Sequence, residues 1–282
     1  MTARPTPRAP TAGHGAIVFE QAGVPPRAHT VLRAARAQSP LRLLTPRNHG
    51  HGAWVIVASL GGGLVDGDAI RLDVEVGPGA VGLLGTQAST KVYRCPTSTC
   101  RQDASARVAA DGVLVLVPDP VACFAGARYE QSLRVELAAS ATLVAVDTFT
   151  AGRSGRGERW DFLRYAARTT VTRAGAPIFL DAVVLDPAHG DLRARMGRFD
   201  AFATMAIFGP RAASLRQAAL APQDEGPPRR TAAVVVAASP IGDDGAVVRI
   251  AGTSVEAVTS AVRARLAGLG ALLGDDPFAR KW

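Results

Sequence analysis

The sequence DAIRLDVEVGPGAVGLL, at residues 68–84, carries the clearest fold signal in the chain. Every second residue from Ile70 to Val76 is apolar and the residues between them are charged, which is the period of a strand with one buried face. The GPGA that follows has the composition of a turn, and VGLL then begins a second apolar run. We therefore expect two strands and a turn, paired as a β-hairpin over residues 68–85.

The same pattern returns further along the chain. LDVEVGPGAVGLL at 72–84 aligns with LRVELAASATLVA at 133–145, because the acidic residue, its apolar neighbours and the alanine after the turn keep the same offsets. ARVAADGVLVLV at 106–117 is a looser copy, and the period is irregular. Repeated strand–turn–strand units indicate a stacked architecture. The expected fold class is mainly β, with stacked β-hairpins in a β-helical or solenoid-like array.

The sequence predicts further strands outside these repeats and two helices. Further strands are expected at 15–20, 29–36, 41–45, 54–60, 161–173, 176–186, 199–208, 231–237 and 246–251. Apolar residues recur every three or four positions over 254–273, which predicts a C-terminal α-helix with one apolar stripe. Thr253 and Glu256 fit a capping box at its start, and Gly274 fits the glycine after its end. One further short helix is expected at about 210–221. The apolar stripe fits either a sheet or a partner protein.

Length and composition limit the class of protein. The chain has 282 residues, of which 48% are hydrophobic and 20% are charged, so it has enough apolar material for a large core. Residues 1–14 contain no apolar stretch, and we expect a disordered N-terminal tail there, followed by a single domain over 15–282. No apolar run approaches the roughly 18 residues that a membrane-spanning helix needs. A cytoplasmic protein without a membrane partner is therefore expected.

The net charge of +8 raises the alternative of a basic nucleic-acid-binding β protein. The arginines, however, are spread along the chain, whereas a nucleic-acid footprint is clustered. All basic residues except Lys91 and Lys281 are arginines, which is typical of a compositional bias. We expect no nucleic-acid partner, and the alternative predicts steeply salt-dependent binding to any duplex.

Cysteines and histidines give no complete metal motif. Cys95, Cys100 and Cys123 contain no CxxC spacing, and we expect buried free thiols. His49 and His51 lie on one side of the chain if the segment is extended, where they are possible extra ligands, half of a nickel or zinc site. The other interpretation of this pair is a glycine-flanked surface loop.

The glycine-rich stretch GGGLVDGD at 61–68 follows an apolar strand but matches no phosphate-binding fingerprint. We interpret it as a tight turn that needs positive φ, with Asp68 capping backbone donors. An oxygen-ligand metal site at Asp66 and Asp68 is the alternative, although the calcium-loop spacing fails because no glutamate stands at the twelfth position.

Two more stretches could carry function. TQASTKVYR at 86–94 is a polar run directly after an apolar strand, and Lys91 is either a functional ammonium or a solvated strand-end lysine. AVDTFTAGRSGRGERWDF at 145–162 is either a functional rim or a polar connection between strands. No nucleophile and base can be paired from the sequence, so we expect no catalytic residues and no enzyme.

Taken together, these motifs resemble the UreD (UreH) family of urease accessory proteins. The order and spacing hold over roughly residues 15–282. The resemblance rests on the motifs at 61–80, 86–94, 117–137, 152–162 and 280–282.

The resemblance implies a function and a set of partners. Members of the family are non-enzymatic scaffolds in the assembly of the nickel metallocentre of urease, and they work with UreF and with the GTPase UreG. It implies that the chain binds urease apoprotein and helps to deliver Ni²⁺, held only transiently, through an internal tunnel. No tightly bound cofactor is expected. The family's fold is a β-helical array with a few helices.

The resemblance also singles out positions in this sequence. They are Gly67 and Asp68 in the glycine–aspartate turn with Gly62 and Gly63 before them, Thr86, Gln87, Thr90 and Lys91 at the polar strand end, and Gly152, Arg153, Gly157 and Glu158 in the glycine–arginine loop. Ser59 and Leu60 stand where many members have a histidine and a proline. Nickel transfer suits weak oxygen ligands. We therefore expect a transient nickel path lined by Asp68, Thr86 and Asp147.

Overall fold

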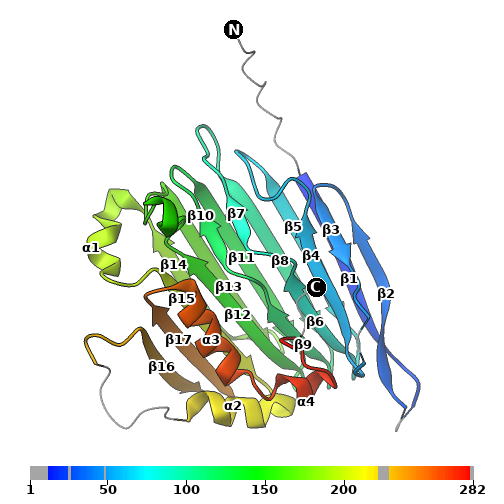
Figure 1. The fold of residues 1–282 in the computed structure, drawn as a ribbon. Helices are drawn as coiled ribbons and strands as arrows, with labels where there is room; N and C mark the ends of the chain where they lie inside the picture. The colour runs from blue at the N-terminus through cyan, green and yellow to red at the C-terminus, as the bar shows by residue number, and fades with distance from the viewer. Residues whose placement is uncertain (1–11, 25–26, 48, 222–228, 280–282) are drawn as a thin grey trace.

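The computed structural model describes residues 12–24, 27–47, 49–221 and 229–279, and about half of them belong to two stacked β-sheets (Figure 1). The strands are β1 (Ala12–Ala22), β2 (His29–Ala37), β3 (Leu41–Leu44), β4 (Ala53–Ser59), β5 (Ala69–Val76), β6 (Val81–Thr86), β7 (Thr90–Val92), β8 (Cys100–Val108), β9 (Val113–Val117), β10 (Val121–Cys123), β11 (Arg128–Leu137), β12 (Thr142–Thr150), β13 (Arg164–Arg173), β14 (Ala176–Leu185), β15 (Ala201–Phe208), β16 (Val234–Ile241) and β17 (Gly245–Gly252). The helices are α1 (Leu192–Met196), α2 (Ala213–Leu220), α3 (Val255–Arg265) and α4 (Leu269–Leu273), with 3-10 turns η1 (Ser154–Arg156), η2 (Pro187–His189) and η3 (Pro210–Ala212).

The two sheets are built by a chain that winds between them. One sheet has seven strands in the order β14-β13-β11-β8-β5-β1-β2, and the other has ten, with β16-β17-β15-β12-β9-β6-β4-β3 along its main path. Strands β1, β5, β8, β11 and β13 run parallel in the first sheet, as β4, β6, β9 and β12 do in the second. This repeated crossing confirms the mainly β, solenoid-like class.

The hairpin expected at 68–85 is wrong in its pairing. Strand β5 pairs with β1 and β8, whereas β6 pairs with β4 and β9 in the other sheet. The turn at 77–80 therefore carries the chain across the sandwich. Turns of successive units stack through backbone bonds, as from Gly79 N to the Ala110 carbonyl at 3.0 Å. Residues that matched in the sequence repeat are also aligned in space, because Leu72 pairs with Ala104 and Ala104 with Leu133.

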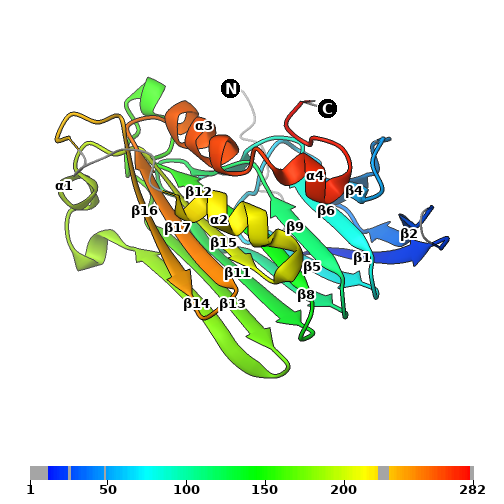
Figure 2. The ribbon, with the colours of Figure 1, turned by 90° about the horizontal axis from the view of Figure 1, so that it is seen from below.

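Apolar side chains fill two layers. One core lies between the sheets and contains Phe19, Tyr129 and Tyr165, all fully buried. The other lies on the outer face of the ten-stranded sheet, beneath α2, α3 and α4 (Figure 2). Val258 and Val262 of the C-terminal stripe are buried there. The stripe thus packs on the sheet of its own chain. The sequence had left open whether it packs on a sheet or on a partner protein.

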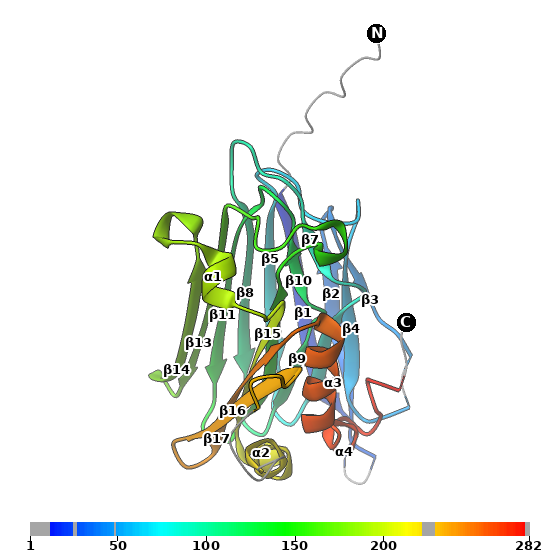
Figure 3. The same cartoon turned by 60° about the vertical axis from the view of Figure 1, so that its left-hand side comes forward.

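The helices follow the sequence with local corrections. The expected helix at 254–273 is divided into α3 and α4, and Gly268 lies at the break. The capping box at Thr253 is wrong by one residue, because Ser254 is the N-cap and its hydroxyl accepts from Ala257 N at 3.2 Å. Gly274 ends α4 with φ +80°, as expected. Helix α1, which the periodicity did not indicate, stands apart from α2, α3 and α4 (Figure 3).

The predicted boundary between the N-terminal tail and the domain, at residues 14 and 15, lies too far along the chain. Residues 12–14 belong to β1 and pair with β5, whereas residues 1–11 lie outside the described part of the chain. The motif at 280–282 also lies outside it. Among the described helices, none has both the length and the apolar character to cross a membrane.

Candidate functional site

A hollow of about 120 Å³ lies between the two sheets. Thr86 from β6 and Asp147 from β12 line it on the ten-stranded side, and Gln102 and Gln131 line it on the seven-stranded side. The structure therefore brings together two of the three residues expected to form a nickel path. Asp68, the third, is not among the residues that line it.

Asp147 is the carboxylate that lines this hollow. Its two carboxylate oxygens each accept from Gln131 Nε2 at 2.9 Å, and the same nitrogen lies 3.2 Å from the Tyr165 hydroxyl. The Tyr129 hydroxyl is 3.1 Å from Oε1 of both Gln102 and Gln131. Burial raises the pKa of Asp147 to about 6, although the bonds from Gln131 oppose this shift. At pH 7 the interior therefore contains a carboxylate that is held by a neutral amide.

Thr86 lines three hollows. Besides the inner one, it lines a hollow of about 210 Å³ below the glycine-rich loop and one of about 70 Å³ beside Pro277 and Phe278. The Thr86 hydroxyl donates to Asp119 Oδ2 at 3.1 Å and accepts from Asp119 N at 2.7 Å. The end of β6 thus borders the space between the sheets and two further hollows.

The glycine-rich loop is a tight turn, as the sequence indicated. Gly67 has φ +81°, and the buried Asp68 carboxylate accepts from Val65 N at 3.0 Å. Gly63 has φ +153°, and a Cβ there would lie 2.5 Å from the Lys91 carbonyl oxygen. Gly62 and Gly63 line the hollow of about 210 Å³. Asp66 accepts from Thr97 and Ser98 instead of pairing with Asp68, and the bond from the Thr97 hydroxyl lowers the pKa of Asp66.

The polar strand end frames the same opening. Gln87, Thr90 and Lys91 line the hollow below the glycine-rich loop, and Lys91 is exposed in β7. Backbone bonds fix the segment, with Gln87 N 2.9 Å from the Val57 carbonyl and Thr90 N 3.1 Å from the Pro120 carbonyl. Lys91 is therefore a solvent-exposed residue in the middle of β7, at the rim of a hollow.

The glycine–arginine loop is held against the turn before β11 by a hydrogen bond and a cation–π contact. The Arg153 guanidinium pairs with Glu158 and lies 4.2 Å above the Phe124 ring centroid. Glu158 Oε2 also accepts from Ala125 N at 3.1 Å. Gly152 and Gly157 both have positive φ, and a Cβ on Gly152 would lie 2.7 Å from the Cys123 carbonyl oxygen. These four residues hold the loop in place and do not line the inner hollow.

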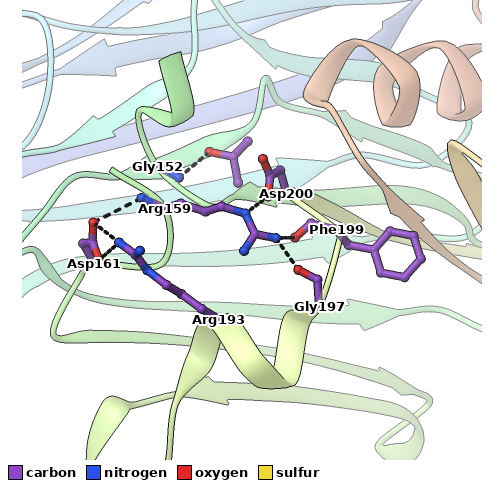
Figure 4. Close-up of polar contacts among 8 residues, drawn as sticks. Gly152, Arg159, Asp161, Arg193, Gly197, Phe199 and Asp200 are labelled. Carbon is purple, nitrogen blue, oxygen red and sulfur yellow. Dashed lines mark hydrogen bonds and ion pairs between the residues drawn. The ribbon is translucent and has the colours of Figure 1, made fainter. Parts of the chain in front are cut away.

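Arg159, which the sequence analysis did not single out, anchors the rest of this loop (Figure 4). Its guanidinium pairs with Asp200 and donates to the carbonyls of Gly197 and Phe199. Arg193 of α1 donates to both oxygens of Asp161 in the same cluster. The loop after β12 is thereby tied to α1 and to the start of β15.

The histidine pair lies elsewhere. His49 N donates to Asp275 at 3.0 Å and the His51 ring lies 3.1 Å from the Leu272 carbonyl, so the segment packs on the residues around α4. Neither histidine lines any of the three hollows that Thr86 lines. Within the described residues, no three His, Cys, Asp or Glu side chains form a group that could hold a metal ion.

Gln102, Asp119 and Gln131 are polar groups of the site that the sequence did not indicate. Gln131 and Gln102 sit within strands, and alternation marks them only as inward-facing residues that are not apolar. An unexpected polar residue on the buried face of a strand is the signal that could have found them.

Comparison with known proteins agrees with the motifs. A family model described as the UreD urease accessory protein matches residues 12–282. A protein of Sorangium cellulosum (strain So ce56) described as urease accessory protein UreD is 58% identical over 275 residues, which cover 98% of this chain and 86% of that one. An Anaeromyxobacter sp. (strain Fw109-5) protein with the same description is 46% identical, with 88% and 83% covered. Urease accessory protein D of Oryza sativa subsp. japonica is 32% identical, with 96% of each chain covered. The chain therefore belongs to the UreD family of urease accessory proteins.

Proposed function

We propose that this chain is a non-enzymatic maturation factor that binds urease apoprotein and, with UreF- and UreG-type proteins, helps to deliver Ni²⁺ to its active site. Membership of the UreD family supports the role in urease maturation. The observation that supports the nickel step is that Thr86 lines three neighbouring hollows, one of which is also lined by Asp147.

The chemistry of this path suits transfer of a cation. The oxygen groups that line it include the Thr86 hydroxyl, the Asp119 and Asp147 carboxylates and the Gln102 and Gln131 amides. Arg168 also lines the inner hollow, and Arg263 lines the one beside Phe278. Such oxygens hold Ni²⁺ less tightly than thiolates or imidazoles, so an ion that enters can leave again. The ionised Asp147 in a poorly hydrated space attracts a cation more strongly than a carboxylate in water does.

The glycine-rich loop and the polar strand end form the rim of one opening, and the C-terminal segment borders another. Because the apolar stripe of α3 is already packed on the sheet, we assign partner contacts to these rims and not to that stripe. Cytoplasmic action follows from the same proposal, because UreF, UreG and urease apoprotein are then its partners.

The path is tested with Asp147→Asn and Thr86→Val in cells that produce urease, UreF- and UreG-type proteins and this chain. Thr148→Val is the matched control, because Thr148 is buried beside Asp147 in β12 but points to the opposite face of the sheet. Nickel per urease active site and urease activity are measured. The proposal expects both path variants to lose most of the loading while the control keeps it. Full loading with both path variants would contradict the path, even if the chain itself were still required.

A further inference from the structure

Cys95 and Cys100 form a pair of thiols outside the hollows just described. Their sulfurs lie 3.4 Å apart and both residues are fully buried, in agreement with the free thiols expected from the sequence. A disulfide bond is about 2.05 Å long, so bonding requires the sulfurs to approach by only roughly 1.4 Å.

The backbone around the pair allows this approach. Cys100 begins β8 and is paired with Tyr129 in the sheet, whereas Cys95 lies in the connection after β7. The residues between them include Thr97 and Ser98, which are exposed and are held by the Asp66 carboxylate. Cys95 N donates to the Gly126 carbonyl at 3.0 Å, so the approach falls on the two side chains and on the exposed residues between them, and not on the ladder of the sheet.

The neighbours of the sulfurs are carbonyl oxygens, which suits thiols better than a metal ion. Cys95 Sγ lies 3.2 Å from the Tyr93 carbonyl oxygen, and Cys100 Sγ lies 3.1 Å from that of Val65. Within the part of the chain that the structure describes, no third ligand completes a metal-binding group here.

We propose that Cys95 and Cys100 are a redox-sensitive pair that forms an intramolecular disulfide when the protein meets a hydroperoxide. The Cys95 thiolate attacks the peroxide O–O bond and takes one oxygen as a sulfenic acid, and the leaving hydroxide becomes water. The Cys100 sulfur then attacks the Cys95 sulfur, the S–S bond forms, and the S–O bond breaks with release of a second water that carries the Cys100 proton. Two thiols and one peroxide thus give one disulfide and two waters.

The order of these steps follows from the two environments. The hydrogen bond with Cys100 lowers the pKa of the Cys95 thiol. The same hydrogen bond and burial raise the pKa of Cys100. The direction of these shifts favours Cys95 as the attacking sulfur and Cys100 as the resolving one, and the geometry of the pair allows either order. Cys123 is also buried, and burial raises its pKa, which makes it an internal comparison.

Trypsin makes the test direct, because cleavage after Arg94 and Arg101 places both cysteines on one peptide, 95–101, and leaves Cys123 on another. The folded full-length chain is treated with hydrogen peroxide, quenched, unfolded, alkylated with N-ethylmaleimide, digested and weighed. The expected result is a 95–101 peptide two mass units lighter than the reduced form and without alkylation, restored by dithiothreitol, while Cys123 takes up one maleimide.

Two variants keep the test decisive. Cys123→Ser should leave the oxidised peptide unchanged, and Cys100→Ser should abolish the mass loss and leave Cys95 alkylatable or further oxidised. Circular dichroism checks that each variant is folded. The proposal is overturned if both thiols of the native protein stay alkylatable at peroxide doses that oxidise the guanidinium-unfolded chain, or if the linked partner is Cys123. This inference does not depend on the nickel path, because neither thiol lines it.

Discussion

Gln131 of β11 bridges the two sheets by donating its side-chain amide to both carboxylate oxygens of Asp147 in β12, each at 2.9 Å. The bond crosses the layer that is otherwise filled by aromatic and aliphatic side chains. It fixes the orientation of the one carboxylate in the inner hollow whose pKa is raised. The Gln131–Asp147 pair therefore affects both the stability of the fold and the proposed passage of nickel.

The ionisation of Asp147 should decrease the free energy of unfolding of the isolated protein as the pH rises. Its folded pKa of about 6 is above the unfolded value near 3.8, so the folded state binds the proton more tightly. This stabilisation is fully present below about pH 4 and is lost as the pH rises through 6. We expect Asp147→Asn to be more stable than the wild type at pH 7.5 by about 1–3 kcal/mol, and the difference to shrink at pH 4.5. Urea unfolding at the two pH values measures it.

The opposite ranking at pH 7.5, with Asp147→Asn clearly the less stable protein, would contradict this reading of the hollow. Thr148→Val again serves as the control, because it changes a buried polar group in the same strand without touching the titrating carboxylate.

Gly63→Ala should destabilise the protein more than Gly62→Ala. Both glycines have positive φ, which costs an alanine about 1 kcal/mol or more. At Gly63 the new methyl would also lie 2.5 Å from the Lys91 carbonyl oxygen and 2.8 Å from the Tyr93 ring, whereas nothing lies within 4 Å at Gly62. Thermal unfolding of the two variants should give a larger fall in Tm for Gly63→Ala. Equal falls would mean that the loop does not pack on β7 as described.

Arg159→Ala should loosen the loop after β12. The guanidinium pairs with Asp200 and with two carbonyls in a partly buried position, and hydrogen bonds to charged groups of this kind contribute about 1.5–3 kcal/mol each. We expect a loss of about 2–4 kcal/mol in the free energy of unfolding. Hydrogen exchange should rise in both the 151–163 loop and α1.

Arg33→Ala is the matched control for Arg159. Arg33 pairs with Glu20 at 3.9 Å, and both side chains are at least half exposed. Exposed pairs contribute less than about 1 kcal/mol, so this variant should unfold near the wild-type midpoint. Similar losses in the two arginine variants would remove the structural argument for the cluster in Figure 4.

Nucleic-acid binding should be weak despite the charge of +8. Arginines on the seven-stranded sheet alternate with acidic partners, as Arg107 with Glu136 and Arg164 with Glu130 and Asp186. A surface of mixed sign lacks the concentrated field that attracts a phosphate backbone. Fluorescence anisotropy with a 20-base-pair duplex should show no binding at 150 mM NaCl with micromolar protein. Micromolar or tighter binding with a steep salt dependence would favour the nucleic-acid alternative.

The strands could be predicted from the sequence because the alternation of apolar and polar residues that produces a strand is local. The alternation from Ile70 to Val76 is the same in β5 as in any half-buried strand. The pairing of the strands could not be predicted in this way, because the chain after a turn at 77–80 can form the next strand in the same sheet or in the other one. Only the ladders to β1 and β8, distant in the sequence, decide between a hairpin and a crossing.

The candidate site shows the same division. Asp68 and the glycine turn were predictable from spacing, and the structure confirms the cap on Val65 N. Thr86 was named through the family resemblance and Asp147 as a polar residue in an otherwise apolar strand, and both line one hollow. Gln131 and Asp119 lie in the motif at 117–137, but spacing did not single them out as site residues, since their hydrogen-bond partners are 16 and 33 residues away. Arg159 was passed over because its partners, Gly197 to Asp200, come from a segment whose helix the periodicity did not indicate.

The most direct test of the central claim is the nickel content and activity of urease produced with UreF- and UreG-type partners, with and without this chain. The account predicts that nickel occupancy and activity appear only when the chain is present. Equal nickel loading and activity in its absence would contradict the proposed role in urease maturation.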